Sequence, residues 1–373
     1  MLPRHVYVHV PFCARRCTYC DFSIAVRRVV PADEYVGAVG RELELRFGGR
    51  GSWTVDSLYF GGGTPSRLGG DGVRRLLDAI RRRIDLAPGA EVTLEANPDD
   101  VTPDVVRAWS AAGVNRLSIG AQSFDDGVLA WMHRTHDSAA IGTAVETARA
   151  GGIDNLSLDL IFALPANIAR SWEVDVDRVL SIAPSHLSLY GLTVEPRTPL
   201  GRSHARGELF ESPDETYESE FVHAHEALTS AGYEHYEVSN FGKPGWHSRH
   251  NSAYWSGAAY AGLGPSAHEF DGANRRWNVA AYSEWLHRLA AGQDPLDERE
   301  QLTADNRLAE QVYLGLRTRG GLAVTATEAP RVAAWVDAGW ATRDPSDRIV
   351  LTALGWLRLD ALAADLTLVR SCY

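Results

Sequence analysis

Short apolar runs alternate with longer segments of helical spacing over about the first 190 residues. The apolar runs are rich in β-branched residues and cover 5–10, 57–60, 91–96, 116–121, 156–162 and 186–192. The segments between them space apolar residues three or four apart, at 33–47, 71–84, 103–112, 138–150 and 171–182. Such alternation favours a parallel sheet with right-handed crossovers. It predicts an α/β fold, a partial (β/α)6 barrel, with functional residues at the carboxyl ends of the strands.

The pattern changes after about residue 195, and the 373 residues divide into three predicted parts. Residues 1–195 form the barrel, 196–300 a linker and accessory region, and 301–373 a mainly helical C-terminal domain. A hairpin predicted within 339–351 lies between helices, which gives the last part a winged-helix-like character. Because the chain is acidic, we interpret that part as a structural module and expect no nucleic-acid partner.

The charge and hydropathy of the chain limit the classes of protein to which it can belong. Lys plus Arg total 37 and Asp plus Glu total 48, which gives a net charge of −11. No stretch of about 18 predominantly apolar residues occurs, so no transmembrane segment is expected. The first residues lack a long apolar segment with a cleavage site, and we therefore expect a cytoplasmic protein. A homodimer and a peripheral contact with a membrane are left open.

Three of the four cysteines, Cys13, Cys17 and Cys20, lie within eight residues directly after the first predicted strand, while Cys372 stands apart. Three thiolates at C-x3-C-x2-C spacing can bind three irons of a 4Fe–4S cluster and leave one iron open. Zinc with His9 or His5 as a fourth ligand is an alternative. Two further alternatives are a redox pair of Cys17 and Cys20 and a set of three structural thiols.

The surrounding residues indicate one of these alternatives. Val8-His9-Val10-Pro11-Phe12 leads to Cys13, and Cys17-Thr18-Tyr19-Cys20 ends the motif with an aromatic residue before the last cysteine. This segment resembles the radical S-adenosylmethionine superfamily. The resemblance implies that Cys13, Cys17 and Cys20 bind a 4Fe–4S cluster and that S-adenosylmethionine chelates the fourth iron. It also assigns Tyr7 and Tyr19 to the S-adenosylmethionine site.

Glycines follow the second predicted strand in Gly61-Gly62-Gly63-Thr64-Pro65. Consecutive glycines let a backbone approach a ligand closely and adopt positive φ. The Gly-Lys-Ser/Thr of a phosphate-binding P-loop does not follow. In the superfamily that the cysteine motif resembles, this loop binds the amino group of the cofactor, a role that we carry to Gly62, Gly63 and Thr64.

Four polar residues fall near later strand ends, namely Glu95, Gln122, Arg134 and Asp159. Asp159 stands between Leu158 and Leu160 in a strand that should otherwise be buried, and a buried carboxylate needs a partner or a ligand. The superfamily resemblance implies that all four contact S-adenosylmethionine. On that basis Arg134 binds the carboxylate, and Gln122 and Asp159 bind ribose hydroxyls.

The second half of the chain indicates a branch of the superfamily. His250-Asn251-Ser252-Ala253-Tyr254-Trp255 and then Gly262-Leu263-Gly264-Pro265 resemble the heme chaperones related to oxygen-independent coproporphyrinogen III oxidase. The resemblance covers nearly the whole chain. It implies a protein that binds heme as cargo and delivers it to apo-hemoproteins.

Two departures from the oxidase pattern favour the chaperone. The oxidase has a fourth cysteine at the position of Phe22, and it has an N-terminal extension, whereas 12 residues precede Cys13 in this sequence. The oxidase remains the alternative function, and a zinc-stabilised interaction protein is the candidate from another class.

Heme requires an axial ligand and an apolar, aromatic surface. His250 with Tyr254 and Trp255 offers both, and these three are the predicted heme-binding residues. His247 and His268 are the rival ligands.

Overall fold

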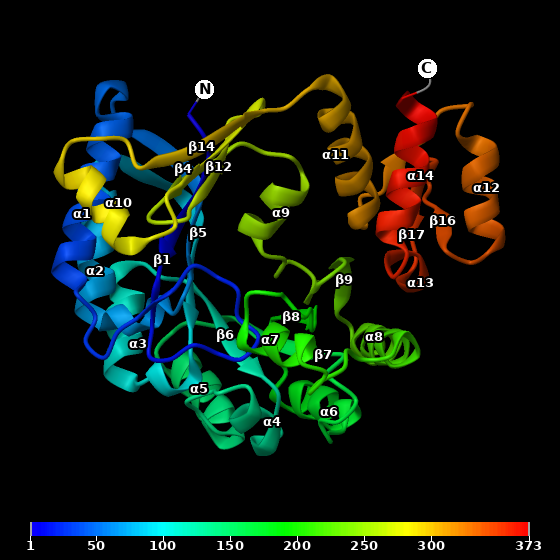
Figure 1. The fold of residues 1–373 in the computed structure, drawn as a ribbon, viewed down its shortest axis with the longest axis horizontal. Helices are drawn as coiled ribbons and strands as arrows, with labels where there is room; N and C mark the ends of the chain where they lie inside the picture. Colours follow the sequence, from blue (N-terminus) through cyan, green and yellow to red (C-terminus); the bar gives the residue numbers. More distant parts are fainter. Residues whose placement is uncertain (1, 372–373) are drawn as a thin grey trace.

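The computed structural model describes residues 2–371, so Cys372 lies outside the described residues (Figure 1). Its main feature is a sheet in the order β14-β13-β12-β11-β1-β4-β5-β6-β7-β8-β10-β9, which curves but does not close on itself within these residues. The buried hydrophobic core lies between this sheet and the helices that cover its outer face. The predicted open barrel is confirmed.

The six predicted strands form the parallel centre of the sheet. They are β1 (His5–Val10), β4 (Trp53–Gly62), β5 (Ile84–Ala96), β6 (Arg116–Gln122), β7 (Asn155–Phe162) and β8 (His186–Gly191). Two of them, β4 and β5, begin several residues earlier than predicted, because residues 53–55 pair in register with 84–86 ahead of the apolar runs. The helix expected to reach residue 84 therefore ends at Ile80.

Helices cover the outer face of these strands: α1 (Ala32–Phe47), α2 (Gly69–Ile80), α3 (Pro103–Ala112), α4 (Asp126–Trp131), α5 (Ser138–Ala150) and α6 (Trp172–Ile182) (Figure 1). Local sequence sets their ends. Helix α3 begins with Pro103 at its first position and ends at Gly113, whose φ of 103° is left-handed. Helix α6 is capped by the Ser171 side chain, which accepts from the Val174 amide. Short 3-10 turns occur at η1 (Gly48–Arg50), η2 (Pro65–Leu68) and η3 (Pro98–Asp100).

Residues 196–300 extend the sheet at both edges. At one edge β11 (Tyr260–Leu263) pairs parallel with β1, followed by the antiparallel β12 (His268–Phe270), β13 (Asn274–Asn278) and β14 (Leu296–Gln301). At the other edge β10 (Asn240–Gly242) pairs antiparallel with β8, and β9 (Glu234–Glu237) pairs with β10. The helices of this part are α7 (Pro199–Ala205), α8 (Asp214–Ser230), α9 (Arg249–Trp255) and α10 (Tyr282–Ala290).

A buried carboxylate fixes the first of these extensions to α1. Glu42 is fully buried, and it accepts hydrogen bonds from the Gly264 amide at 2.9 Å and from the Asn278 side chain at 2.7 Å. It also accepts from the Trp285 indole at 3.0 Å and pairs with Arg46 at 2.7 Å. This satisfied network joins the first helix to residues more than 200 positions later in the chain.

The C-terminal part is mainly helical, as predicted. It contains α11 (Ala304–Arg317), α12 (Ala329–Asp337), α13 (Ala353–Trp356) and α14 (Leu359–Ser371), with a small sheet of β15 (Leu322–Ala323), β16 (Ala341–Arg343) and β17 (Arg348–Leu351). The predicted hairpin is confirmed as β16 and β17, which pair antiparallel. Figure 1 shows this part at the far side of the molecule from α1 and α2. Within residues 2–371, each helix is too short or too polar to cross a lipid bilayer.

Candidate functional site

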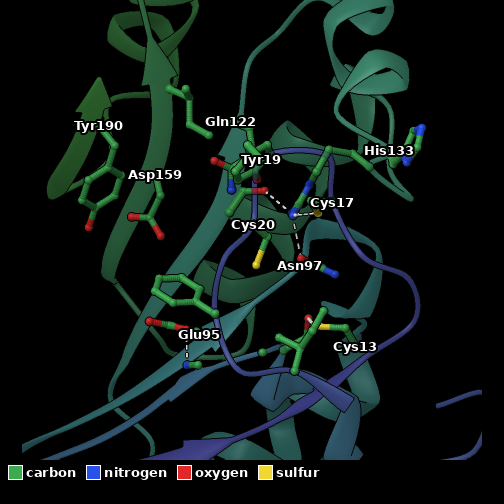
Figure 2. Close-up of a pocket in the computed structure, with 18 of the residues that line it drawn as sticks. Cys13, Cys17, Tyr19, Cys20, Glu95, Asn97, Gln122, His133, Asp159 and Tyr190 are labelled. Carbon is green, nitrogen blue, oxygen red and sulfur yellow. Dashed lines mark hydrogen bonds between the residues drawn. The ribbon is translucent and has the colours of Figure 1, made fainter. Parts of the chain in front are cut away.

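The three motif cysteines face one cavity at the carboxyl ends of the parallel strands. The cavity has a volume of about 420 Å³, and Cys13, Cys17 and Cys20 all line it as free thiols (Figure 2). The loop that carries them is held at its base, because β2 (Phe12–Cys13) pairs with β3 (Ala25–Val26). The Thr18 amide also donates to the Met132 carbonyl at 3.3 Å, which ties the middle of the loop to the end of α4.

The thiols are poorly solvated in this cavity. Burial raises the pKa of Cys13, and burial raises the pKa of Cys20 to about 11. The Cys13 sulfur lies 3.4 Å from the Thr64 hydroxyl, and the Cys17 sulfur accepts a hydrogen bond from Arg134 Nη1 at 3.6 Å. Bare thiolates are therefore unfavourable here, and bound iron would compensate for their burial.

The glycine loop packs directly against the cysteine loop. The Gly63 amide donates to the Val10 carbonyl at 2.8 Å, and the Thr64 amide donates to the Phe12 carbonyl at 2.8 Å. A Cβ on Gly63 would lie 2.7 Å from the Pro11 backbone, and Gly62 has a φ of 111°. Both positions therefore require glycine, the first for space and the second for conformation.

Two half-buried carboxyl groups line the cavity opposite the cysteines. Glu95 on β5 accepts from the Tyr59 hydroxyl at 2.9 Å and from the Gly62 amide at 3.0 Å. Burial raises the pKa of Glu95 to about 7, and the nearby Asp159 adds to this rise. Asp159 on β7 accepts from the Ser118 hydroxyl at 3.0 Å, and burial raises its pKa as well. Both carboxyl groups thus suit hydrogen bonding to a polar ligand in the cavity.

The end of β6 and the segment after α4 bring two more predicted residues, Gln122 and Arg134, to the cavity. Gln122 and His133 both have positive φ, 67° and 60°, and each lines the cavity. Positive φ in residues other than glycine is concentrated at functional sites. Arg134 Nη2 donates to the Asn97 side chain at 2.7 Å and to the Gly120 carbonyl at 2.8 Å. Its buried Nε has no partner among residues 2–371, so the guanidinium retains a donor for a ligand.

Eleven of the predicted cluster and cofactor residues therefore surround one cavity: Cys13, Cys17, Tyr19, Cys20, Gly62, Gly63, Thr64, Glu95, Gln122, Arg134 and Asp159. Tyr7 does not line it. Its ring stacks on Tyr59, which does line the cavity, with centroids 6.1 Å apart. Three further residues that line the cavity were not predicted from the sequence: Tyr59, Asn97 and Tyr190. All three stand near the carboxyl ends of predicted strands, and that location was a signal that could have indicated them.

The predicted heme residues lie elsewhere, and their environment does not offer an axial ligand. His250 is 1% exposed, its Nδ1 is hydrogen-bonded to the Ser57 hydroxyl at 2.8 Å, and its Nε2 to the Tyr254 hydroxyl at 2.9 Å. Burial lowers the pKa of His250 to about 3, so the imidazole is a neutral core residue. Arg317 lies over the Trp255 ring, 4.0 Å from its centroid.

The histidines of the zinc alternative are also engaged in hydrogen bonds. His9 Nδ1 lies 3.1 Å from the Tyr7 hydroxyl, and His9 Nε2 lies 2.9 Å from the Ser23 carbonyl. His5 Nδ1 is hydrogen-bonded to Ser57. Within residues 2–371, no three His, Cys, Asp or Glu side chains are grouped as ligands of a single metal ion. The three cysteines instead share a cavity that also has the buried polar groups of a ligand site.

The parallel open barrel and the cysteine loop at its carboxyl edge define a radical SAM protein. The family model described as the Radical SAM superfamily matches residues 7–177. The chain is 39% identical over 370 residues to the heme chaperone HemW of Mycobacterium tuberculosis. That alignment covers 98% of this chain and 95% of the relative. It is 34% identical to the heme chaperone HemW of Bacillus subtilis, over 86% of this chain and 84% of that protein. The chain belongs to the HemW family within the radical SAM superfamily.

A solved structure supports the same fold. Coproporphyrinogen III oxidase from Escherichia coli, described as a radical SAM enzyme, superposes with a TM-score of 0.82. The match covers 97% of this chain and 90% of the oxidase at 24% sequence identity, which supports the architecture alone. Membership of the radical SAM superfamily implies a 4Fe–4S cluster and S-adenosylmethionine. The free thiols, the glycine loop and the unpartnered Arg134 Nε fit these groups.

Proposed function

We propose that this protein is a cytoplasmic heme chaperone that holds a 4Fe–4S cluster and S-adenosylmethionine and delivers heme to apo-hemoproteins. The observation that carries the proposal is the single cavity shared by the three cysteines and the half-buried carboxyl and amide groups, in a chain that matches heme chaperones over nearly its full length.

Within this proposal, Cys13, Cys17 and Cys20 bind the cluster. The backbone of Gly62 and Gly63 approaches the amino group of S-adenosylmethionine, and Glu95 stiffens that loop by accepting from the Gly62 amide. The cluster and S-adenosylmethionine supply one-electron chemistry when they are bound.

The remaining residues orient the cofactor. Arg134 binds its carboxylate, for which the buried guanidinium is suited because Asn97 and Gly120 hold it in place. Gln122 and Asp159 accept or donate at the ribose hydroxyls. Tyr19 covers the cluster, and its hydroxyl is buried beside Cys17.

The alternative is an oxygen-independent coproporphyrinogen III oxidase, and one observation opposes it. Phe22 stands at the position of the fourth cysteine of that enzyme, lines the cavity and is 61% exposed. The position therefore presents an apolar surface at the mouth of the cavity where the oxidase has a thiol.

An anaerobic experiment tests the function. The chain is reconstituted with iron and sulfide, its spectrum is recorded, and heme and coproporphyrinogen III are then offered separately with S-adenosylmethionine. Stoichiometric heme uptake without decarboxylation supports the chaperone. Repeated turnover of coproporphyrinogen III to protoporphyrinogen would overturn it, and retained zinc without a four-iron spectrum would favour the interaction protein.

A further inference from the structure

A second cavity lies outside the radical SAM site, in the accessory region. It has a volume of about 360 Å³ and lies between β9, the loop before α9, α9 itself and the segment that follows α11. Figure 1 shows α9 between the main sheet and α11. The residues that line this second cavity and those that line the first do not overlap. It therefore needs an explanation of its own.

A half-exposed histidine stands in this cavity. The His247 side chain is 35% exposed, and its ring stacks on Tyr236 with centroids 4.1 Å apart and planes at 17°. His247 Nε2 is buried and lies 2.8 Å from a carboxylate oxygen of Glu234, although among residues 2–371 it has no partner in hydrogen-bond geometry, and Nδ1 is therefore the ring nitrogen left for a metal. Carboxylates in this position fix the orientation of metal-binding histidines and increase the basicity of the ring. His250, three residues later, has neither the exposure nor a free ring nitrogen.

The cavity also offers apolar and cationic groups. Trp255 lines it, and its buried Nε1 has no hydrogen-bond partner among residues 2–371. Arg319 lines the cavity with a side chain that is 56% exposed, and its Nη1 is 3.6 Å from Glu234. An imidazole, an indole and a guanidinium match the iron, the ring and the propionates of heme.

We propose that this cavity is the heme site and that His247 is the axial ligand, with Glu234 as its positioning residue and Arg319 as a propionate partner. The proposal rests on the heme-chaperone function and specifies where the cargo binds. A single protein ligand in a partly open cavity suits a cargo that has to leave again, because the acceptor needs access to the iron.

The experiment is a hemin titration of the reconstituted full-length protein, followed by the Soret band, for wild type, His247→Ala and His268→Ala. His268 is the matched control, because it is exposed and also stacks on an aromatic ring, that of Trp277, outside this cavity. We expect His247→Ala to lose the Soret shift and to bind hemin at least tenfold more weakly. Loss of an orienting carboxylate typically weakens metal binding by about 10–100-fold, and we expect the same of Glu234→Gln. His268→Ala should match wild type.

Three readouts keep the outcomes distinct. The thermal melt and the 4Fe–4S spectrum of reconstituted His247→Ala should both match wild type, which shows that a lost Soret shift does not come from misfolding. If wild type binds hemin and His247→Ala binds it equally, the assignment of His247 is wrong and the chaperone function stands. If wild type binds no hemin, the proposed function itself fails, and the heme site fails with it.

Discussion

The cavity at the strand ends and the cavity beside α9 differ in how their side chains are fixed. The first is built on parallel strands, whose carboxyl ends meet at one edge, so residues far apart in sequence had to converge there. The second is built on the short edge strand β9, two irregular segments and a seven-residue helix, and in the irregular segments neither exposure nor direction follows from position. His250 shows the difference, because its motif suggested a ligand and its surroundings bury it. A motif on a regular strand edge is therefore stronger evidence for a site than a motif in an irregular segment.

The largest expected effect separates the two cavities chemically. Replacement of Cys13, Cys17 or Cys20 by Ala should abolish the 4Fe–4S spectrum after anaerobic reconstitution, because each removes one of three thiolate ligands. Hemin binding should persist, since the second cavity shares no residue with the first. Iron analysis and the Soret titration measure both, and Cys372→Ala serves as the control outside the motif. Joint loss of cluster and hemin binding would contradict two independent sites.

The next effect tests whether His250 is a structural residue. His250→Ala leaves the Ser57 and Tyr254 hydroxyls without their imidazole partner and removes a ring that stacks on Tyr59 at 5.0 Å. We expect a loss of about 3 kcal/mol in the free energy of unfolding. Urea unfolding measures it, and the exposed His268→Ala should change stability by less than about 0.5 kcal/mol. Unchanged stability together with a lost Soret shift would restore His250 as the heme ligand.

A pH dependence tests the burial of the first cavity. The pKa of Glu95 is raised from 4.5 to about 7 by burial, so the folded state holds a proton that the unfolded state releases. The contribution of Glu95 to stability should therefore fall as pH rises between about 4.5 and 7. Glu95→Gln should remove this part of the dependence, up to about 3 kcal/mol between pH 5 and pH 8. The comparison is made by urea unfolding of both proteins at each pH, and parallel curves would contradict it.

The smallest effect concerns the cap of one helix, α6, in the barrel that carries the first cavity. Ser171→Ala removes the hydroxyl that accepts from the Val174 amide at the start of α6. We expect a loss of about 1 kcal/mol in unfolding free energy, as is usual for an N-cap. Ser171→Asp, which keeps a capping acceptor, is the matched control and should retain most of the stability. Equal losses in both variants would show that the cap contributes little.

The sequence by itself determined the parallel centre of the fold and most of the first site. The alternation of β-branched runs and helical segments fixes a parallel sheet, and a parallel sheet brings its strand ends together, so Glu95, Gln122 and Asp159 could be assigned to one edge. The cysteine spacing and the glycine loop indicated the cluster site and the cofactor site. Tyr59 and Asn97 were missed although the same rule covers them.

Only the tertiary structure decided where the strands of the second half pair and which of its side chains are exposed. Strands β9 and β10 extend one edge of the main sheet by pairing with β8, and β11–β14 extend the other edge by pairing with β1. On that second side Glu42 of α1 bonds Gly264 and Asn278, more than 200 positions later in the chain. The burial of His250 and the exposure of His247 depend on the same kind of long-range packing, since Ser57 and Glu234 come from separate strands. Exposure is set by which distant residues pack against a side chain, and no local pattern in the sequence encodes that.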